Sequence, residues 1–306
     1  MPVRFVIHCL SHFLNCVVIM VGLFAIGSHL QERQILDMKQ KILVLDIDGT
    51  LTNSKKEITP KTKSALLDIQ KKGHIIMLAS GRPTPGMLRY AKELELATYG
   101  GYLLSYNGAR IMHCKTGEII CQQTLPRTII PELYAFAKEN GCGLISYDGD
   151  MVISGTGMDE YIELEARING LPIKEVDNFT EYINYDVNKC LMTAPPEHAE
   201  KCMLALQKKF EGILSIYRSE PFFIEIMPQN VDKAASLDNM LKIVGLNRED
   251  TICCGDGYND ITMISYAGVG VAMANARDEV KAAANFVTGS NDEDGLVEVI
   301  EKFILA

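Results

Sequence analysis

The sequence lacks the excess of positive charge that nucleic-acid-binding proteins carry. Its 306 residues include 30 Lys and Arg against 39 Asp and Glu, which gives a formal net charge of −9. Binding to phosphate backbones depends on Lys and Arg gathered on one face, whereas here the Lys residues are scattered among Glu and Asp. We therefore expect no nucleic-acid partner, and no feature of the sequence implies a protein partner.

The sequence also lacks the cysteine patterns of a disulfide-rich or zinc-binding protein. The nine cysteines are odd in number and form no C-x-x-C pair, and several lie inside apolar runs. This pattern is typical of reduced, buried thiols in a cytoplasmic protein. A zinc site requires Cys or His ligands at close spacing, and we identify none, so we expect no zinc site.

Low-complexity tracts and a disordered composition are absent as well. Hydrophobic residues make up 47% of the chain and charged residues 23%, which is the composition of a globular protein. A chain of this length is comfortable for two domains, and its core needs no disulfide or metal to stabilise it.

The first 37 residues differ from the rest, because residues 5–26 are mostly apolar. A membrane anchor over residues 5–27 is one interpretation, and a signal peptide is another. The anchor is interrupted by polar residues, namely His8, Ser11, His12 and Asn15. A signal peptide would need more than the single Arg4 and a clear small-x-small cleavage site. We favour a third interpretation, in which residues 1–37 are translated upstream sequence and Met38 is the working start, with membrane tethering as the alternative.

An α/β pattern begins directly after this segment. Residues 41–47 form a continuous apolar run, which is typical of a strand covered on both faces of a parallel sheet. Thr59 and Pro60 are an N-cap and a first-turn proline, and Gly73 is a helix-ending glycine. A second apolar run at residues 74–79 completes a β-α-β unit.

The alternation returns near the C-terminus. We expect helices at residues 234–244 and 260–266 and strands at 251–254 and 269–273, followed by helices around residue 281 and over 295–303. Between them, from residue 121 to 222, the order of elements is mixed α+β. The predicted organisation is a Rossmann-like, parallel-sheet α/β core made of residues 38–120 and 223–306, with an α+β cap domain inserted at residues 121–222.

The strongest chemical signal is Asp46-Ile47-Asp48-Gly49-Thr50, directly after the first strand. A spacing of two residues in an extended chain puts both carboxylates on one side, and Gly49 allows a sharp turn. One carboxylate can attack phosphorus while the other acts as general acid and then base. A cation would have to offset the crowded negative charge, and oxygen ligands point to Mg²⁺. Taken alone, the same motif is also compatible with a polar turn.

A second signal is the run Gly255-Asp256-Gly257-Tyr258-Asn259-Asp260. Asp256 follows an apolar strand and could supply another metal ligand, although the run could also be a surface turn. Ligands of open α/β sheets gather at the carboxyl ends of the strands. The polar residues at 46–48, 80–82 and 255–260 all fall at such ends, so we expect them to converge on one edge.

Together with Ser80-Gly81-Arg82-Pro83, Tyr106-Asn107-Gly108-Ala109 and Lys233, these motifs resemble the haloacid dehalogenase (HAD) superfamily of phosphotransferases. The closer resemblance is to its Cof-type sugar phosphatases, which carry a large α/β cap, and it covers the chain from Met38 onward. It implies a phosphoric monoester hydrolase that acts on small phosphorylated metabolites, and it implies Mg²⁺ as cofactor.

The resemblance also implies roles for individual residues. Asp46 would be the nucleophile, Asp48 the acid/base, and Lys233 the cation that offsets the charge of Asp46 and the phosphate. Mg²⁺ would be held by the Asp46 side chain, the Asp48 carbonyl and the Asp256 side chain, with Asp260 orienting Lys233 or a ligand of the metal. The residues expected to bind phosphate or substrate are Gly49, Thr50, Ser80, Gly81, Arg82, Asn107 and Asn259.

Some assignments stay open at this point. Arg82 would either bind the phosphate or sugar of the substrate or pair with a surface carboxylate. Asn107 would face the substrate, but Asn-Gly is also the commonest turn dipeptide. Sugar phosphomutases use the same Asp-x-Asp chemistry, and a non-catalytic phosphate-binding protein could use the same fold. The residues of the predicted cap match no substrate signature, so the sequence does not name the substrate. No motif in the sequence indicates the oligomeric state.

Overall fold

The computed structural model describes residues 39–306, of which residues 41–306 form one compact unit. The predictions for residues 1–37 lie outside the described residues. Within residues 39–306, no helix combines the length and the apolarity that a bilayer crossing requires.

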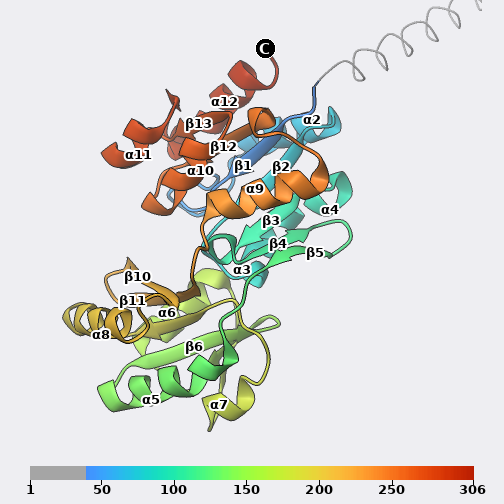
Figure 1. Ribbon diagram of the computed structural model, residues 1–306. Coiled ribbons are helices and arrows are strands. Elements are labelled where there is room, and N and C mark those ends of the chain that lie inside the picture. Colours follow the sequence, from blue (N-terminus) through green and yellow to red (C-terminus); the bar gives the residue numbers. More distant parts are fainter. Residues whose placement is uncertain (1–38) are drawn as a thin grey trace, which may run out of the picture. The chain divides into compact units, whose positions relative to one another are not determined.

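An eight-stranded sheet, the larger sheet, carries the first and last thirds of the described chain (Figure 1). Its strand order is β14-β13-β12-β1-β2-β3-β4-β5, and the strands from β14 to β3 run parallel while β4 and β5 are antiparallel. The strands are β1 (Ile42–Leu45), β2 (Ile75–Ala79), β3 (Tyr102–Ser105), β4 (Arg110–His113), β5 (Ile119–Gln122), β12 (Thr251–Gly255), β13 (Val269–Ala272) and β14 (Phe286–Val287). The predicted parallel α/β sheet is confirmed.

Helices cover both faces of this sheet, which explains why β1 is apolar at every position. Leu43 and Leu45 belong to the core under α2, α3 and α12, whereas Ile42 and Val44 belong to the core under α9 and α10. The helices are α2 (Pro60–Lys71), α3 (Thr84–Glu93), α4 (Leu96–Tyr99), α9 (Lys233–Val244), α10 (Ile261–Tyr266), α11 (Asp278–Ala283) and α12 (Gly295–Phe303). Short 3₁₀ turns at Tyr106–Gly108, Arg127–Ile129, Arg248–Asp250, Tyr258–Asp260 and Asn291–Glu293 complete the connections.

The predicted helix start at Thr59 is confirmed. Thr59 Oγ1 accepts a hydrogen bond from the Thr62 backbone N–H at 3.2 Å, and Pro60 occupies the first helical position. Gly73 follows the helix end with φ of +91°, a conformation that glycine adopts without steric cost. The cap and the glycine therefore fix the length of α2 and deliver the chain to β2.

A second, six-stranded sheet, the smaller sheet, has the order β10-β11-β9-β6-β7-β8. Its strands are β6 (Gly143–Asp148), β7 (Met151–Ser154), β8 (Ile173–Glu175), β9 (Cys190–Thr193), β10 (Leu214–Glu220) and β11 (Phe223–Pro228). Its helices are α5 (Ile130–Asn140), α6 (Glu160–Asn169), α7 (Phe179–Tyr182) and α8 (Pro196–Lys209). All pairs except β7–β8 are antiparallel, which agrees with the mixed α+β order expected here.

The boundaries of the two sheets differ from the predicted limits of residues 121 and 222. Cys121 and Gln122 lie in β5 of the larger sheet, and Phe223–Pro228 forms β11, which lies between β10 and β9 in the smaller one. Both β11 and the short elements β8 and α7 were absent from the prediction. We refer to residues 123–228 as the inserted region; its standing as a separate domain stays a prediction, since residues 41–306 form one compact unit.

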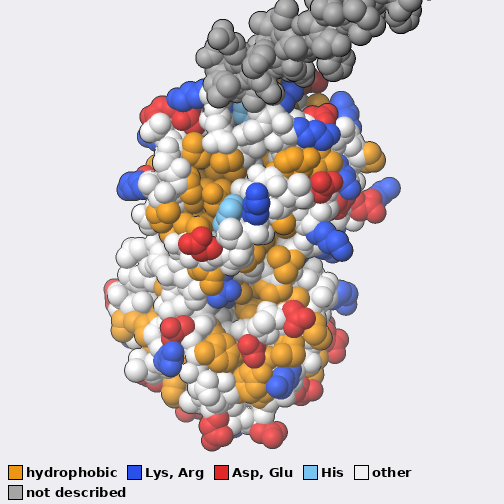
Figure 2. Space-filling model, turned by 90° about the vertical axis from the view of Figure 1, so that its right-hand side faces the viewer, with side chains coloured by type: hydrophobic (Ala, Val, Ile, Leu, Met, Phe, Trp, Pro, Cys, Tyr) orange, Lys and Arg blue, Asp and Glu red, His pale blue; other side chains and the backbone are white. Residues whose placement is uncertain are grey.

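The surface carries charges of both signs. On the face drawn in Figure 2, Lys and Arg side chains are interspersed with Asp and Glu, and hydrophobic side chains lie between them. On that face, no positive patch of the kind that nucleic acids require is visible.

Candidate active site

Four loops carry the predicted site residues other than Lys233, and each follows a neighbouring strand of the larger sheet. Asp46 follows β1, Ser80 follows β2, Asn107 follows β3 and Asp256 follows β12. These strands are parallel, and Leu45 at the end of β1 is in register with Leu78 and Cys254. The carboxyl ends therefore lie at one edge, as expected for a ligand site of an open α/β sheet.

Lys233 lies at the centre of this edge, with 1% of its surface exposed. Its Nζ donates to Asp46 Oδ1 at 2.6 Å, to Asp260 Oδ1 at 2.6 Å and to the Ala79 carbonyl at 2.9 Å. An ammonium has three protons, so every donor is used. Burial opposes its charge, but Asp260 and then Asp46 outweigh burial and raise the pKa of Lys233, which keeps it charged.

The carboxylates outnumber this one buried ammonium. Oxygens of Asp46, Asp256 and Asp260 lie within 4.8 Å of one another. Burial, followed by repulsion from Asp260, raises the pKa of Asp46 well above its ordinary value. Burial also raises the pKa of Asp256 to about 6. Excess negative charge without sufficient compensation is the environment that favours binding of a cation.

Asp260 is not free to bind a metal directly. Besides accepting from Lys233, it accepts the backbone N–H groups of Asp256 and Gly257 through Oδ2, at 3.0 and 2.9 Å. It therefore holds both the lysine and the loop that presents Asp256, which fits the orienting role expected for it.

Gly49 and Thr50 shape the loop around Asp256. Gly49 has φ of +87°, and a Cβ there would lie 2.3 Å from Asp256 Oδ2, so a side chain would collide with the carboxylate. Thr50 Oγ1 donates to Asp256 Oδ1 at 3.0 Å. The two residues thus allow and fix the close approach of two loops that are 206 positions apart in sequence.

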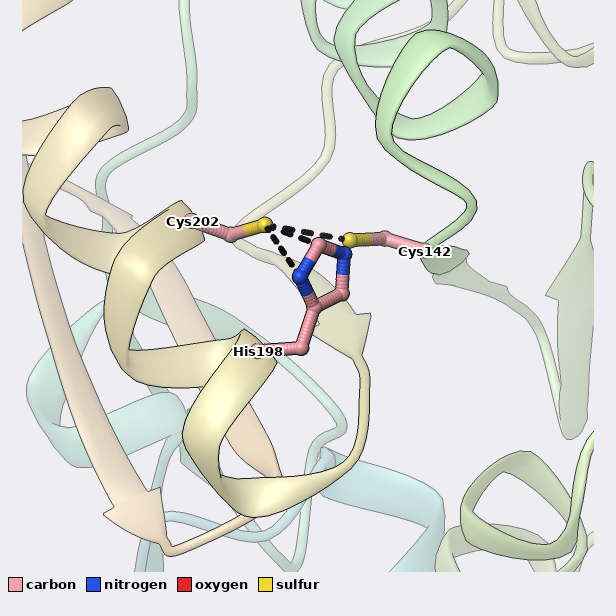
Figure 3. A group of neighbouring side chains, drawn as sticks. All are labelled: Cys142, His198 and Cys202. Atoms are coloured by element: carbon pink, nitrogen blue, oxygen red, sulfur yellow. Dashed lines mark hydrogen bonds between the residues drawn. The ribbon is translucent and has the colours of Figure 1, made fainter.

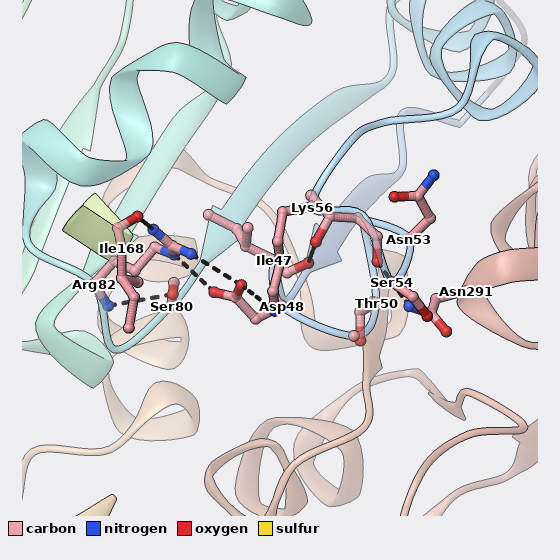
Figure 4. A network of polar contacts seen from close by, with 12 residues as sticks. Ile47, Asp48, Thr50, Asn53, Ser54, Lys56, Ser80, Arg82, Ile168 and Asn291 are labelled. Carbon is pink, nitrogen blue, oxygen red and sulfur yellow. Dashed lines mark hydrogen bonds and ion pairs between the residues drawn. The ribbon is translucent and has the colours of Figure 1, made fainter. Parts of the chain in front are cut away.

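Asp48 lies beside Asp46 in sequence but has different partners (Figure 4). Arg82 binds the Asp48 carboxylate with two hydrogen bonds: Nε donates to Oδ2 at 2.7 Å and Nη2 donates to Oδ1 at 2.9 Å. Lys56 Nζ also donates to Oδ1, at 3.0 Å. Burial opposes the charged form, but Arg82 and then Lys56 overcome it and hold the pKa of Asp48 at about 2. In this arrangement Asp48 is a carboxylate, so it has no proton to give.

Arg82 also connects this edge to the inserted region. Its Nη1 donates to the carbonyl of Ile168 in α6 at 2.7 Å, and only 8% of the residue is exposed. Of the two roles left open for Arg82, the structure shows the carboxylate pairing, and the partner is the predicted acid/base itself. Ser80 lies within the same loop, where its Oγ accepts the Arg82 backbone N–H at 3.2 Å.

Asn107 joins three parts of the chain. Its Oδ1 accepts from Asn259 Nδ2 at 3.0 Å, and its Nδ2 donates to the Tyr217 hydroxyl of β10 at 2.8 Å. It has φ of +53° and is 8% exposed, so it forms the turn expected of Asn-Gly and also lies at the site. Gly81 lies against it, since a Cβ on Gly81 would be 3.1 Å from Asn107 Nδ2.

All predicted site residues therefore gather at one edge, but several of their partners were not predicted. Lys56 pairs with Asp48, Asn275 Nδ2 donates to the Gly49 carbonyl at 2.8 Å, and Lys189 Nζ donates to the Gly81 carbonyl at 3.3 Å. Lys189 is buried and pairs with Glu225 at 3.0 Å. A charged residue next to the buried strand β9 is the one signal in the sequence that could have marked Lys189.

A cavity of about 300 Å³ lies close to this edge, between the larger sheet and the inserted region. Residues of both parts line it, among them Tyr106, Arg110, Tyr147 and Lys189. None of the predicted catalytic or metal-binding residues lines it, so the site described above is a separate feature.

The family model of haloacid dehalogenase-like hydrolases matches residues 43–300. The chain belongs to this family. The Bacillus subtilis protein YxeH, which carries the name of a phosphatase, is 32% identical over 269 residues, covering 87% of this chain and 99% of the relative.

Solved structures of the family agree with the fold. A haloacid dehalogenase-like hydrolase from Bacteroides thetaiotaomicron has a TM-score of 0.85 and 42% identity, covering 87% of this chain and all of that one. A sugar phosphatase of HAD subclass IIB has a TM-score of 0.74 and 27% identity, covering 87% of this chain and all of that one. The predicted resemblance is confirmed, and this haloacid dehalogenase-like hydrolase is a phosphoric monoester hydrolase.

Proposed function

We propose that this hydrolase is a Mg²⁺-dependent phosphatase that cleaves small phosphomonoesters, sugar phosphates in particular, through an aspartyl-phosphate on Asp46. One observation carries the proposal. Asp46 is fixed at the sheet edge by Lys233 at 2.6 Å and lies within 4.8 Å of the oxygens of Asp256 and Asp260, while Asp48 is bound separately by Arg82. The two carboxylates of the motif thus lie in different environments, as two different roles require.

The residues present fit a magnesium ion. Asp46 and Asp256 offer carboxylate oxygens, and the Asp48 backbone offers a carbonyl oxygen two residues after Asp46. Burial, and after it repulsion from Asp260, raises the pKa values of Asp46 and Asp256, and a bound cation would offset both effects. When bound there, the ion would offset charge on the carboxylates and on the phosphoryl oxygens. Lys233 supplies a permanent part of the same compensation.

The chemistry of the protein residues then balances in two steps. In the first, an Asp46 oxygen forms a bond to phosphorus, the bond from phosphorus to the alcohol oxygen breaks, and Asp48 gives its proton to that oxygen. In the second, Asp48 takes a proton from water as the water oxygen attacks phosphorus. Phosphate leaves and the Asp46 carboxylate is restored, so each group ends as it began.

This sequence of steps requires a change at Asp48. With its pKa held at about 2 by Arg82 and Lys56, Asp48 is unprotonated near neutral pH and cannot act first as an acid. A phosphate group arriving beside Arg82 offers the guanidinium a competing bidentate partner. We infer that substrate binding draws Arg82 from Asp48, so that Asp48 acquires a proton only when substrate is present.

The sugar-phosphate class is supported by the similarity to the subclass IIB sugar phosphatase and by polar groups of the inserted region that lie near the edge. Tyr217 reaches Asn107, and Lys189 reaches the Gly81 carbonyl, so both connect β9 and β10 to the phosphate-side loops. Groups of this kind can hydrogen-bond the hydroxyls of a sugar. A location in the cytoplasm stays a prediction.

The proposal is tested by phosphate release from a panel of sugar phosphates and phosphorylated cofactors, with and without Mg²⁺. We expect release that needs Mg²⁺, is lost in Asp46→Asn and is retained in Asp68→Asn, a change of the same chemistry on an exposed carboxylate of α2. Transfer of phosphate to a second sugar instead of water would indicate a phosphomutase. Binding of phosphoesters without turnover would indicate a non-catalytic protein.

A further inference from the structure

A second group of potential metal ligands lies outside the active site, in the inserted region. Cys142, His198 and Cys202 place their donor atoms within 4.8 Å of one another (Figure 3). The two sulfur atoms are 3.5 Å apart, and Cys202 Sγ is 3.6 Å from Nε2 and 4.0 Å from Nδ1 of His198. Two soft sulfur donors and one borderline nitrogen donor thus lie close enough to bind a single ion.

The fold brings these donors together from two elements. Cys142 lies between α5 and β6, just after the Gly141 that ends α5 in a left-handed conformation. His198 and Cys202 lie four residues apart on α8, a spacing that puts both side chains on one face. From the sequence we expected no Cys or His ligands at close spacing, and the pair His198 and Cys202 corrects that expectation. Cys142 is 60 positions from Cys202, so only the fold brings it to the pair.

The imidazole is oriented for ligation. His198 Nε2 lies 2.6 Å from the backbone carbonyl of Asn140, so the proton is placed on Nε2 and donated to that oxygen. Nδ1 then keeps its lone pair, and it lies 4.0 Å from Cys202 Sγ. Metal-binding histidines commonly donate their second N–H to a backbone carbonyl, which fixes the ring and its tautomer.

The spacing of the donors fits an ion better than it fits a disulfide. Two thiolates bound to tetrahedral zinc at about 2.3 Å each are about 3.8 Å apart, close to the separation seen here. A disulfide requires a sulfur–sulfur distance of about 2.05 Å, so both cysteines are free thiols.

We propose that Cys142, His198 and Cys202 bind one thiophilic metal ion of the zinc type. The ion would fasten α8 to the connection between α5 and β6, two places that already pack in one apolar cluster through Cys142 and Cys202. Both cysteines are buried, with 4% and 3% of their surface exposed, whereas His198 is half-buried and gives the ion a route from solvent. Three protein ligands leave a fourth position for water.

The experiment titrates the reduced, full-length, metal-free protein with Co²⁺ in the presence of excess Mg²⁺, which occupies oxygen ligands. Co²⁺ bound by thiolates shows sulfur-to-metal charge-transfer absorption, which carboxylate ligands do not produce. We expect this band to saturate at one ion per chain and to disappear when Zn²⁺ is added. His198→Gln and Cys202→Ser should each weaken Co²⁺ binding by about 100-fold or more, since even indirect supports of a metal site contribute 10- to 100-fold.

Cys190→Ser is the matched control, because Cys190 is a fully buried thiol of the same apolar cluster and lies outside the ligand group. It should keep the band. His198→Gln alters a half-buried residue, so its folding can be verified by circular dichroism, and Zn²⁺ should raise the melting temperature of the wild type but not of this variant. The proposal is overturned if the reduced wild type shows no charge-transfer band, or if the band survives in both ligand variants. It is also overturned if the protein takes up no metal and peroxide joins Cys142 and Cys202 in a disulfide.

Discussion

Residues 39–306 contain two groups of metal-binding residue types with opposite chemistry. The first consists of Asp46 and Asp256 at the edge of the larger sheet, supported by Asp260 and Lys233. The second consists of Cys142, His198 and Cys202 on the helical side of the inserted region. The first offers hard carboxylate oxygens, and the second offers two soft sulfur donors and one borderline imidazole nitrogen.

The types of donor atom decide what each group can do. Carboxylates crowded at a sheet edge favour binding of a hard cation, and the cation in turn favours binding of a phosphate. The first group therefore suits the proposed phosphoryl transfer. Thiols and an imidazole packed between a helix and a loop suit an ion that is retained and stabilises the fold. Variants should therefore affect one group and leave the other unchanged.

The largest effect is expected from Lys233→Met. The change removes the ammonium and leaves the buried Asp46 and Asp260 unpaired, which should lower the free energy of unfolding by about 3–5 kcal/mol. Phosphate release should fall by about 1,000-fold or more, because charge compensation in the transition state is lost. Urea denaturation and initial rates measure the two effects.

Lys242→Met is the control for this change. Lys242 and Asp238 are also 2.6 Å apart, but 69% of the lysine side chain is exposed, so the expected change in stability is at most about 1 kcal/mol. Equal effects of the two variants would contradict the importance of burial. Co²⁺ binding by Cys142, His198 and Cys202, which we call the thiol–imidazole group, should be the same in both variants.

Asp256→Asn should separate metal dependence from folding. The folded-state pKa of about 6 exceeds the ordinary value of 3.8, so ionising Asp256 costs stability as the pH rises from about 4 through 6. In metal-free protein the variant should therefore be more stable by about 1 kcal/mol above pH 6 and should show no gain below pH 4. The Mg²⁺ concentration for half-maximal activity should rise at least about 10-fold.

Thermal melts at several pH values, with and without Mg²⁺, provide the measurement. A metal-free variant less stable than the wild type at pH 7 would show that Asp256 is not in an unfavourable environment. Loss of the cobalt charge-transfer band in this variant would break the proposed independence of the two groups.

Arg82→Gln tests the pairing that holds Asp48. The variant should raise the pKa of Asp48 from about 2 toward its ordinary value and lower kcat/KM by about 10- to 100-fold, because a bidentate partner of carboxylate and phosphate is lost. Rate profiles between pH 3 and 8 measure both. Lys63→Gln, which alters an exposed pair with Glu93, is the control and should change neither quantity.

The smallest effect is expected from Tyr217→Phe. It removes one hydrogen bond, from Asn107 Nδ2 to the tyrosine hydroxyl, and should cost about 1 kcal/mol of stability. KM should increase a few-fold with little change in kcat, since the contact links the inserted region to the substrate side of the edge. Tyr134→Phe, which loses an exposed hydrogen bond to the Asp177 carbonyl, should leave KM unchanged.

The contrast between the two groups also explains what could be predicted from the sequence. Asp46 and Asp256 lie in short contiguous motifs that end apolar strands, so the continuous apolar runs of β1 and β12 were enough to place both carboxylates at one edge. The partners of Asp48 could not be inferred in this way. Lys and Arg side chains are usually exposed, so the sequence gives no reason to pair Lys56 or Arg82 with a site residue. The paths of their two loops bring both side chains to the Asp48 carboxylate.

The thiol–imidazole group shows the other limit. His198 and Cys202 share a helical face and could have been paired from their spacing, but Cys142 joins them only through the packing of α8 beside the end of α5. The strand β11 was missed for a related reason. Its central Glu225 interrupts an otherwise apolar run, and that residue is tolerated because Lys189 pairs with it inside the fold.

The site of covalent phosphorylation decides whether Asp46 is the nucleophile. Asp48→Asn should still allow Asp46 to attack an activated phosphoester, but it should slow the hydrolysis that follows, so the phosphoryl group accumulates on the protein. We predict that mass spectrometry of this variant, quenched in acid, finds one phosphoryl group on the peptide that contains Asp46, and none when Asp46→Asn is added. Turnover by the wild type with no phosphoryl group trapped on Asp46, or with one trapped on another residue, would contradict the account.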